Sequence, residues 1–343
     1  MTALRPAIPL LLLFIAPLLS AQQPASPSPA GRSIDLDVVV TPKSGPPVSG
    51  LEQKDFTLLD NKAPQAITSF HALSGPDAPV EVILLIDAVN TGYQNIAYER
   101  GEIDKFLRAN GGKLAHPAAL AIFTDPGVRM VGGSSTDGNA LAAMLDKETV
   151  ALRAITRSAG FYGAEDRFNM SMKALQQLTV DEGPHPGRKL IFWISPGWPL
   201  LTGPRVDLAA KEEQRLFQAI IDVSTQLRQA RITLYNINPL GATEDSLRTF
   251  YYEEFVKGVT KPSQVNVGNL SLQVLAVQTG GLVLNSDNDI SQMLQQAFRD
   301  AAGWYEISFQ PAPSEPNEYH KLEVRVDKPG LDVRTRTGYY AQP

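Results

Sequence analysis

The sequence predicts an α/β protein: a doubly wound, mostly parallel sheet with helices on both faces, inserted into a small β-sandwich formed by the N- and C-terminal segments. Three observations predict this architecture. Continuous apolar runs, of which Val82–Ile86 is the clearest, are typical of strands buried on both faces of a parallel sheet. Helical patterns separate these runs, as in βαβ units. Segments near both chain ends alternate apolar and polar residues, which indicates half-buried strands.

Residues 1–21 have the features of a secretory signal peptide. Arg5 precedes an apolar stretch over residues 8–19, and small residues follow it. The stretch is short for a membrane span, and prolines interrupt it. We therefore expect an exported protein, periplasmic or secreted, with no membrane insertion after cleavage; retention of the segment as an anchor is the alternative. Residues 22–32 are rich in Pro, Ser and Ala, which predicts a flexible tether.

Composition excludes several classes of site. The chain has no cysteine, so disulfides, thiolate metal sites and cysteine nucleophiles are excluded. The net charge is −5 and no Lys/Arg-rich run exists, which argues against nucleic-acid binding. An exported chain without disulfides depends on its core, and 343 residues are enough to bury one.

The two chain ends are predicted to form one discontinuous domain. Residues 33–75 and 303–341 hold short alternating strands; the alternation is clearest in Leu322, Val324 and Val326. Either end alone would leave strand edges and an apolar face exposed. We therefore expect both ends to pair into one β-sandwich-like domain, with 79–302 as an insertion that has its own core.

The insertion alternates strand-like and helical segments. A helix is predicted to start after the capping residues Asp287–Asp289, and residues 269–279 are predicted to form a helix that Gly280 and Gly281 end. The apolar faces of the helices are expected to pack on the sheet. The expected strands are 82–86, 119–123, 128–131, 190–194, 232–237 and 282–284.

Several segments resemble the von Willebrand factor A domain. They are the Asp87 strand, GRKLIFWISPG (187–197), ARITLYNINPLG (230–241) and LAVQTGGLVLNSDND (275–289). The flanks DFTLLDNKAPQAITSF, WYEISF, EYHKLEVRV and VRTRTGYYA resemble those of bacterial, acidobacterial-type VWFA-related exported proteins. The resemblance covers residues 33–341. It implies a von Willebrand A-like sheet and an exported compartment, while the biochemical role of that family is largely undefined.

In von Willebrand factor A domains with a working metal site, three loops at the top of the sheet hold a divalent cation. The first loop supplies Asp-x-Ser-x-Ser, the second a Thr and the third an Asp. Here the first loop has Asp87, Val89 and Thr91, and Pro196 stands where the later Asp is expected, after Ser195. The second loop, 163–171, has no Thr. A hard cation needs several oxygen ligands, at least one of them a carboxylate. We therefore expect no cofactor; a degenerate Mg²⁺ or Mn²⁺ site at Asp87, Thr91 and Ser195 is the alternative.

Asp87 also has a structural interpretation, which we favour. Its carboxylate is expected to be buried and to accept hydrogen bonds from loop amides or from Asn90 and Thr91. Enzyme motifs such as Gly-x-Ser-x-Gly, a phosphate-binding glycine loop and His-Glu-x-x-His are absent, so we expect no enzyme. A hydrolase using Asp87 and Asp125 as an acid–base pair stays a second alternative.

An aromatic insertion follows the expected strand 232–237. EDSLRTFYYEEF includes Tyr251 and Tyr252, which suit a recognition surface; the same segment could instead form an amphipathic helix that covers the sheet. The expected function is recognition of a protein partner in the cell envelope by a non-enzymatic module. Cation-dependent adhesion and hydrolysis are the alternatives. The expected binding face comprises Asp87, Asn90, Thr91, Asp125, Ser195, Tyr251 and Tyr252.

Overall fold

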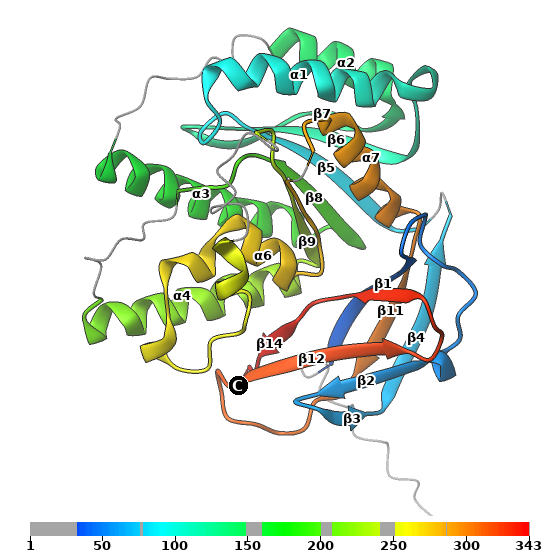
Figure 1. Cartoon of the computed structure of the whole chain (residues 1–343), viewed down its shortest axis with the longest axis vertical. Coiled ribbons are helices and arrows are strands. Elements are labelled where there is room, and N and C mark those ends of the chain that lie inside the picture. Colours follow the sequence, from blue (N-terminus) through cyan, green and yellow to red (C-terminus); the bar gives the residue numbers. More distant parts are fainter. Residues whose placement is uncertain are drawn as a thin grey trace, which may run out of the picture. The chain divides into compact units, whose positions relative to one another are not determined.

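The computed structural model describes residues 33–75, 78–148, 160–199, 208–240, 251–285 and 287–342 (Figure 1). The predicted signal peptide and tether therefore lie outside the described residues. Among the described residues, no helix combines the length and apolar character that a membrane crossing requires.

A six-stranded sheet forms the centre of the insertion, in the order β10-β9-β8-β5-β6-β7. All its strand pairs are parallel except the β6–β7 hairpin. The strands are β5 (Val80–Asp87), β6 (Lys113–Thr124), β7 (Gly127–Asp137), β8 (Arg188–Ile194), β9 (Ile232–Ile237) and β10 (Val283–Leu284).

The apolar run of β5 is buried on both faces, as the sequence predicts. Val82, Leu84 and Ile86 belong to the core on one side of the sheet. Ile83 and Leu85 belong to the core on the other side. Side chains alternate between the two faces of a strand, so a central strand of a covered sheet needs apolar residues at every position.

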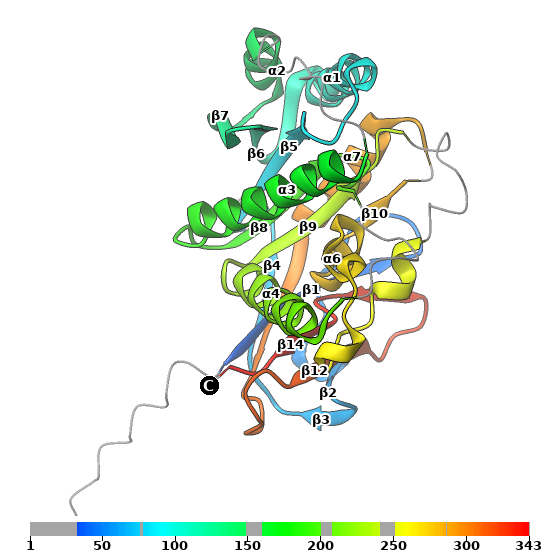
Figure 2. The same ribbon diagram turned by 90° about the vertical axis from the view of Figure 1, so that its left-hand side faces the viewer.

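Helices cover both faces of the sheet (Figures 1 and 2). One core takes side chains from α1 (Tyr93–Arg108), α2 (Gly138–Lys147) and α7 (Ile290–Phe298). The other takes them from α3 (Phe161–Glu182), α4 (Ala210–Gln229) and α6 (Leu272–Gln278). The 3-10 helices are η1 (Gln53–Asp55), η2 (Ala109–Gly112), η5 (Tyr251–Phe255), η6 (Pro262–Gln264), η7 (Val267–Leu270) and η8 (Arg299–Ala301).

The helix caps follow the local sequence with one difference. Asp289 caps α7, accepting a hydrogen bond from the Gln292 amide at 2.8 Å, as its position predicts. Gly280 adopts a left-handed φ of 88° just past α6, which is the expected stop. The α-helix, however, starts at Leu272 rather than 269, because the Ser271 side chain caps it and η7 precedes it.

The two chain ends form two four-stranded sheets, β13-β1-β11-β4 and β14-β12-β2-β3. β1 and β11 pair antiparallel, with Ile34 opposite Phe309, so the N-terminal and C-terminal segments share one sheet. Apolar side chains from both sheets meet in a third core. The strands are β1 (Ile34–Pro42), β2 (Phe56–Asp60), β3 (Ala63–Gln65), β4 (Ile67–Ser74), β11 (Gly303–Phe309), β12 (Tyr319–Val326), β13 (Leu331–Arg334) and β14 (Gly338–Tyr340).

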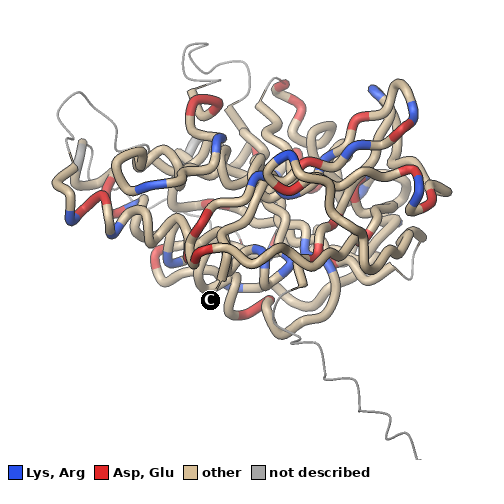
Figure 3. The backbone as a smooth tube through the Cα atoms, turned by 90° about the horizontal axis from the view of Figure 1, so that it is seen from below, with Lys and Arg blue, Asp and Glu red and all other residues tan. Residues whose placement is uncertain are grey.

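The predicted fold class is confirmed: a mostly parallel sheet with helices on both faces is inserted into a sandwich made by the chain ends. Ion pairs join the two parts. Arg231, just before β9, contacts Asp37 of β1 at 2.6 Å and Glu306 of β11 at 2.5 Å. Asp300 accepts hydrogen bonds from Arg334 at 2.8 Å and from the Tyr235 hydroxyl at 2.6 Å. Figure 3 shows positive and negative residues interspersed along the chain.

Candidate functional site

Asp87 lies at the carboxyl end of β5, between β6 and β8. The chain leaves β5 toward β6 on one side and later returns to β8 on the other. This is a topological switch point, where open α/β sheets bind ligands. The side chain of Asp87 is fully buried. The position is that of a ligand site, but a fully buried carboxylate depends on partners within the protein.

The Asp87 carboxylate accepts four hydrogen bonds from the chain itself. Oδ1 accepts from the backbone amides of Val89 at 2.9 Å and Asn90 at 2.8 Å. Oδ2 accepts from the Asn90 side-chain amide at 2.8 Å and from the Trp193 indole at 2.9 Å. Each oxygen therefore has two donors, which fills its lone-pair capacity. A cation or a substrate proton could reach this carboxylate only by displacing protein donors.

Burial raises the pKa of Asp87, and the hydrogen bonds from Asn90 and Trp193 oppose that rise. Asn90 is itself fixed, because its side-chain amide also donates to the Ser171 hydroxyl of α3 at 3.0 Å. That hydroxyl in turn donates to the Arg167 carbonyl at 2.8 Å. Through Asn90, hydrogen bonds connect Asp87 at the end of β5 with Ser171 of α3. Asp87 therefore stabilises the contact between the sheet and this helix.

The other residues of the degenerate metal motif are buried as well. Ser195 is fully buried, and its hydroxyl accepts a hydrogen bond from the Gly197 amide at 3.1 Å. Thr91 is buried, and its hydroxyl has no hydrogen-bond partner. Val89, at the position of a family hydroxyl, packs into the core with α3 and α4. The structure brings Asn90 and Trp193 into contact with Asp87, and the Ser195 hydroxyl also opposes the rise in the pKa of Asp87, whereas Thr91 makes no hydrogen bond to it.

A second buried carboxyl group, Glu99 of α1, lies near this edge. Both of its oxygens lack hydrogen-bond partners, and its side chain is fully buried. Burial raises its pKa well above the ordinary value, and the charge of Asp87 raises it further. The Thr91 hydroxyl lies near enough to oppose that rise slightly, although it is outside hydrogen-bonding geometry. Burial therefore favours the neutral, protonated form of Glu99.

Glu99 was not among the expected site residues, although the sequence contains a signal for it. Ile96 lies three residues before it and Ile103 four residues after it, and both are buried in the core under α1. Residues at these spacings share one helix face. A glutamate between them is on the face that packs on the sheet.

Asp125 lies in a different environment from Asp87. It follows β6 in the turn to β7 and is exposed. Phe123, two residues earlier, is the residue that pairs with Asp87 in the sheet. The two carboxyls of the hydrolase alternative are therefore placed on neighbouring strand ends, one in the core and one in solvent.

Tyr251 and Tyr252 are half-buried in η5. The Tyr251 ring packs against Phe255, with centroids 5.1 Å apart. The Phe255 carbonyl accepts a hydrogen bond from the Asn269 side chain at 3.2 Å. The described part of the aromatic insertion is a 3-10 turn that lies against η7 and α6. Residues 241–250, which include Phe250, lie outside the described residues.

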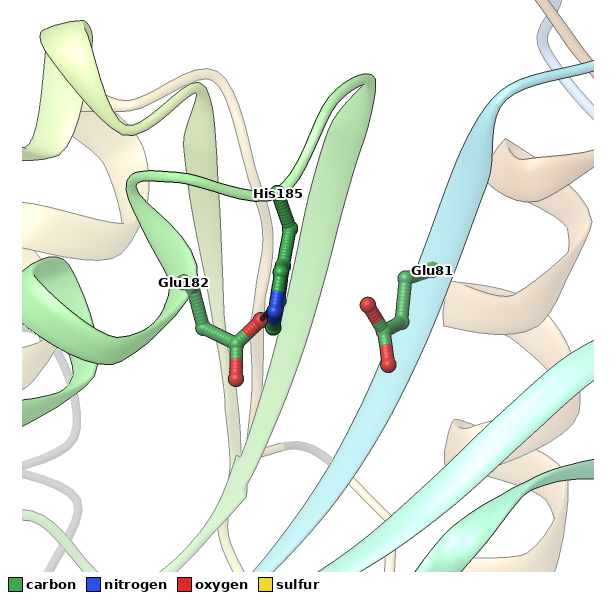
Figure 4. Close-up of side chains that lie close together, drawn as sticks. All are labelled: Glu81, Glu182 and His185. Carbon is green, nitrogen blue, oxygen red and sulfur yellow. Dashed lines mark hydrogen bonds and ion pairs between the residues drawn. The ribbon is translucent and has the colours of Figure 1, made fainter.

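A group of metal-ligating side chains lies at the opposite, amino end of the sheet (Figure 4). Glu81 of β5, Glu182 at the end of α3 and His185 offer ligand atoms within 4.8 Å of one another. His185 Nδ1 is 3.0 Å from Glu182 Oε2. Burial and the charge of Glu182 raise the pKa of Glu81. One imidazole and two carboxylates suit a transition-metal ion. Without a metal, His185 and Glu182 pair with each other.

His185 and Glu81 lie far apart in the sequence. The three residues come together only because β5 and β8 are neighbours, so that both strands start at the same edge. Nothing in the local sequence gives that adjacency. The nearby Lys189 donates to the backbone carbonyls of His185 and Ala230, and its charge opposes the rise in the pKa of Glu81.

The N-terminal part of α3 extends past the Asp87 edge (Figure 1). Ser171 meets Asn90 at that edge, and Glu182 lies near Glu81 at the other. The ten residues from Phe161 to Met170 therefore span about 15 Å of helix beyond this contact. Tyr162 in this part is 79% exposed. This helix end thus presents an exposed aromatic ring beyond the Asp87 edge.

No protein-family model matches this chain, and neither does any curated protein. Solved structures with similar arrangements include a conserved hypothetical protein, BatB, from Bacteroides thetaiotaomicron, 11% identical, with a TM-score of 0.33, covering 65% of this chain and 98% of that one. The SpRpn10 VWA domain is 10% identical, with a TM-score of 0.32, covering 69% and 100%. The manganese-loaded Plasmodium vivax TRAP protein is 10% identical, with a TM-score of 0.33, covering 78% and 96%. Scores this low carry no argument, and the fold assignment depends on the strand order of the chain itself.

Proposed function

We propose that this chain is a non-enzymatic binding module that recognises a protein partner at the carboxyl edge of its parallel sheet, without a metal ion. One observation carries the proposal: the Asp87 carboxylate accepts four hydrogen bonds from the chain and is fully buried. A carboxylate with these partners orders the loop around it. It has no free lone pair for a cation or a substrate.

Cation-dependent adhesion through Asp87, Thr91 and Ser195 is less well supported. A divalent cation would have to displace the indole or amide donors from Asp87. Of its three candidate ligands, Asp87, Thr91 and Ser195, only Asp87 would then supply a carboxylate. The hydrolase alternative has the same weakness, since a general base must be able to reach a substrate proton. Asp87 could do so only after its network had broken.

The projecting end of α3 supports recognition of a protein surface. Tyr162 presents an aromatic ring on a regular helix, with the exposed acidic residues Glu165 and Asp166 one turn further along. Exposed tyrosines are enriched at the centres of protein interfaces. A rigid helix also lowers the ordering cost of binding. The network from Asp87 through Asn90 to Ser171 holds this helix on the sheet.

The family and the compartment belong to this proposal too. The order of central and flanking motifs over residues 33–341 supports membership of the VWFA-related exported proteins, and the apolar N-terminal segment supports export to the periplasm or beyond. The partner would then be a protein of the cell envelope.

A photo-crosslinking amino acid at position 162 tests the proposal. The full chain carrying it is incubated with envelope extract in buffer with EDTA, and covalent adducts are counted by mass after irradiation. The matched control places the same amino acid at Val180, which is 66% exposed on the other end of the same helix. We expect one dominant adduct from position 162 and none from 180.

A competition arm identifies the contact. Excess unlabelled wild type should suppress the adduct, and excess Tyr162→Ala should suppress it at least about fivefold less, since hot-spot truncations exceed about 1 kcal/mol. Adducts that form equally at both positions, or only with Mg²⁺ or Mn²⁺ present, would contradict the proposal.

A further inference from the structure

A cavity of about 270 Å³ lies at the amino end of the sheet, away from the Asp87 edge. The end of α1, the start of β6 and the end of α7 enclose it. Its walls are largely apolar, with the rings of Phe106 and Phe298 and the side chain of Leu114. The two phenylalanine rings pack edge to face, 5.6 Å apart, and so provide a rigid aromatic wall.

A buried histidine lines this cavity. His116 lines the cavity, its side chain is 5% exposed, and its Nδ1 has no hydrogen-bond partner. Burial lowers the pKa of His116, so the imidazole is neutral at pH 7. Nδ1 is closed off from solvent, so Nε2 is the ring nitrogen that can reach a bound group. The imidazole ring is held by Phe298, with centroids 6.0 Å apart.

Two cations line the same cavity. Lys113 and Arg299 are exposed, and neither has an ion-pair partner among the described residues. No lining residue is acidic. The nearest acidic groups along the chain and across the strand pair are engaged elsewhere: Asp300 binds Arg334 and Tyr235, and Asp137, opposite Lys113, caps α2.

We propose that this cavity binds a small amphipathic carboxylic acid. The aromatic or aliphatic body of the ligand packs on Phe106 and Phe298, and its carboxylate lies toward Lys113 and Arg299. His116 Nε2 supplies the hydrogen bond that orients it. Apolar walls with a few convergent polar groups are typical of small-molecule sites. This inference is independent of the proposed protein-recognition surface, which lies at the other edge of the sheet.

The size of the cavity limits the ligand to about ten non-hydrogen atoms, since it is just below the range of drug-sized sites. Ligands of that size bind with dissociation constants of about 1 mM or somewhat tighter. A titration observed on the ligand by NMR covers this range. Phenylacetate is the probe, with phenylacetamide and 2-phenylethylamine as neutral and cationic controls of nearly the same shape.

The experiment uses the full chain at pH 7 and low salt. We expect phenylacetate to bind at least about fivefold more tightly than phenylacetamide, and 2-phenylethylamine not to bind, because two partly exposed charges each contribute up to about fivefold. Added salt should narrow the gap between acid and amide, since screening acts on the charged probe alone. Equal affinity for all three probes, or no binding of phenylacetate, would overturn the proposal.

Variants then locate the site. Arg299→Gln and Lys113→Gln should each weaken phenylacetate about two- to fivefold. His116→Phe should weaken it while keeping the volume of the ring. Lys173→Gln, on the exposed face of α3, is the matched control and should change nothing. Thermal melts confirm that each variant folds. If all three lining variants bind as wild type does, phenylacetate occupies another place and the proposal is wrong.

Discussion

Asp87 and Glu99 are two fully buried carboxyl groups at the same edge of the sheet, and they are held in opposite ways. Asp87 accepts four hydrogen bonds, whereas neither oxygen of Glu99 has a partner. Burial alone disfavours both charges. The difference shows that donors, rather than depth, decide whether a buried carboxyl orders its surroundings. Hydrogen bonds oppose the rise in the pKa of Asp87, whereas burial and the charge of Asp87 raise the pKa of Glu99 well above its ordinary value.

The largest expected effect follows from removing Asp87. Asp87→Ala leaves the donors of Val89, Asn90 and Trp193 buried without an acceptor, so we expect a loss of about 3–5 kcal/mol in the free energy of unfolding. Urea denaturation measures it. Asp166→Ala, at an exposed position on α3, is the control and should match wild type within error. A small loss for Asp87→Ala would mean that the network contributes little.

Glu99→Gln should have the next largest effect, and it should depend on pH. Because the folded-state pKa of Glu99 is raised, its contribution to stability is fully present below the ordinary value of 4.5 and is lost as pH rises through the folded-state pKa. In that window wild type should lose about 1.4 kcal/mol per pH unit relative to Glu99→Gln.

Urea midpoints at pH 5, 6, 7 and 8 test the Glu99 prediction. Glu102→Gln is a control on the same helix, because the Glu102 carboxylate accepts a hydrogen bond from the Ser291 amide at 3.3 Å. It should not become relatively more stable with rising pH. A pH-independent difference between wild type and Glu99→Gln would show that Glu99 is charged in the folded protein.

Asn90→Ala should cost less, about 1–2 kcal/mol, since it removes one of the four hydrogen bonds on Asp87 and the link to Ser171. Ser171→Ala removes the link alone and should cost less still. Hydrogen exchange should show faster opening of the first turns of α3 in both variants. Unchanged exchange there would separate the Asp87 network from the position of that helix.

Much of the fold could be predicted from local sequence. The uninterrupted apolar run of β5 fits only a strand with a core on each side, and Asp289 and Gly280 mark helix ends through their own chemistry. Strand lengths were harder to predict. β6 extends from Lys113 to Thr124, well beyond the apolar residues 119–123, because its pairing with β7 continues through the polar residues of a hairpin.

The site was less predictable, because its decisive contacts join distant residues. Asp87 is separated from Trp193 by 106 positions, and only the pairing of β5 with β8 brings the indole to the carboxylate. Glu99 could be placed on a buried face from its spacing, but the lack of a donor for it depends on the packing of three elements. The sequence shows that Val89 and Pro196 stand in place of oxygen ligands. The donors that bind Asp87 in place of the cation come together only in the folded chain.

The central claim is that protein donors satisfy Asp87 in place of a cation. Thermal melts of wild type, Asp87→Asn and Glu182→Gln in EDTA, Mg²⁺ and Mn²⁺ test it most directly. Glu182→Gln shows whether any effect of a cation comes from the group of Glu81, Glu182 and His185 instead. We predict that Mg²⁺ and Mn²⁺ change the melting temperature of Asp87→Asn by the same amount as that of wild type. A cation at about 100 times its dissociation constant would raise the melting temperature of a chain of this length by about 4 °C. Such a rise in wild type and Glu182→Gln, absent from Asp87→Asn, would contradict the account.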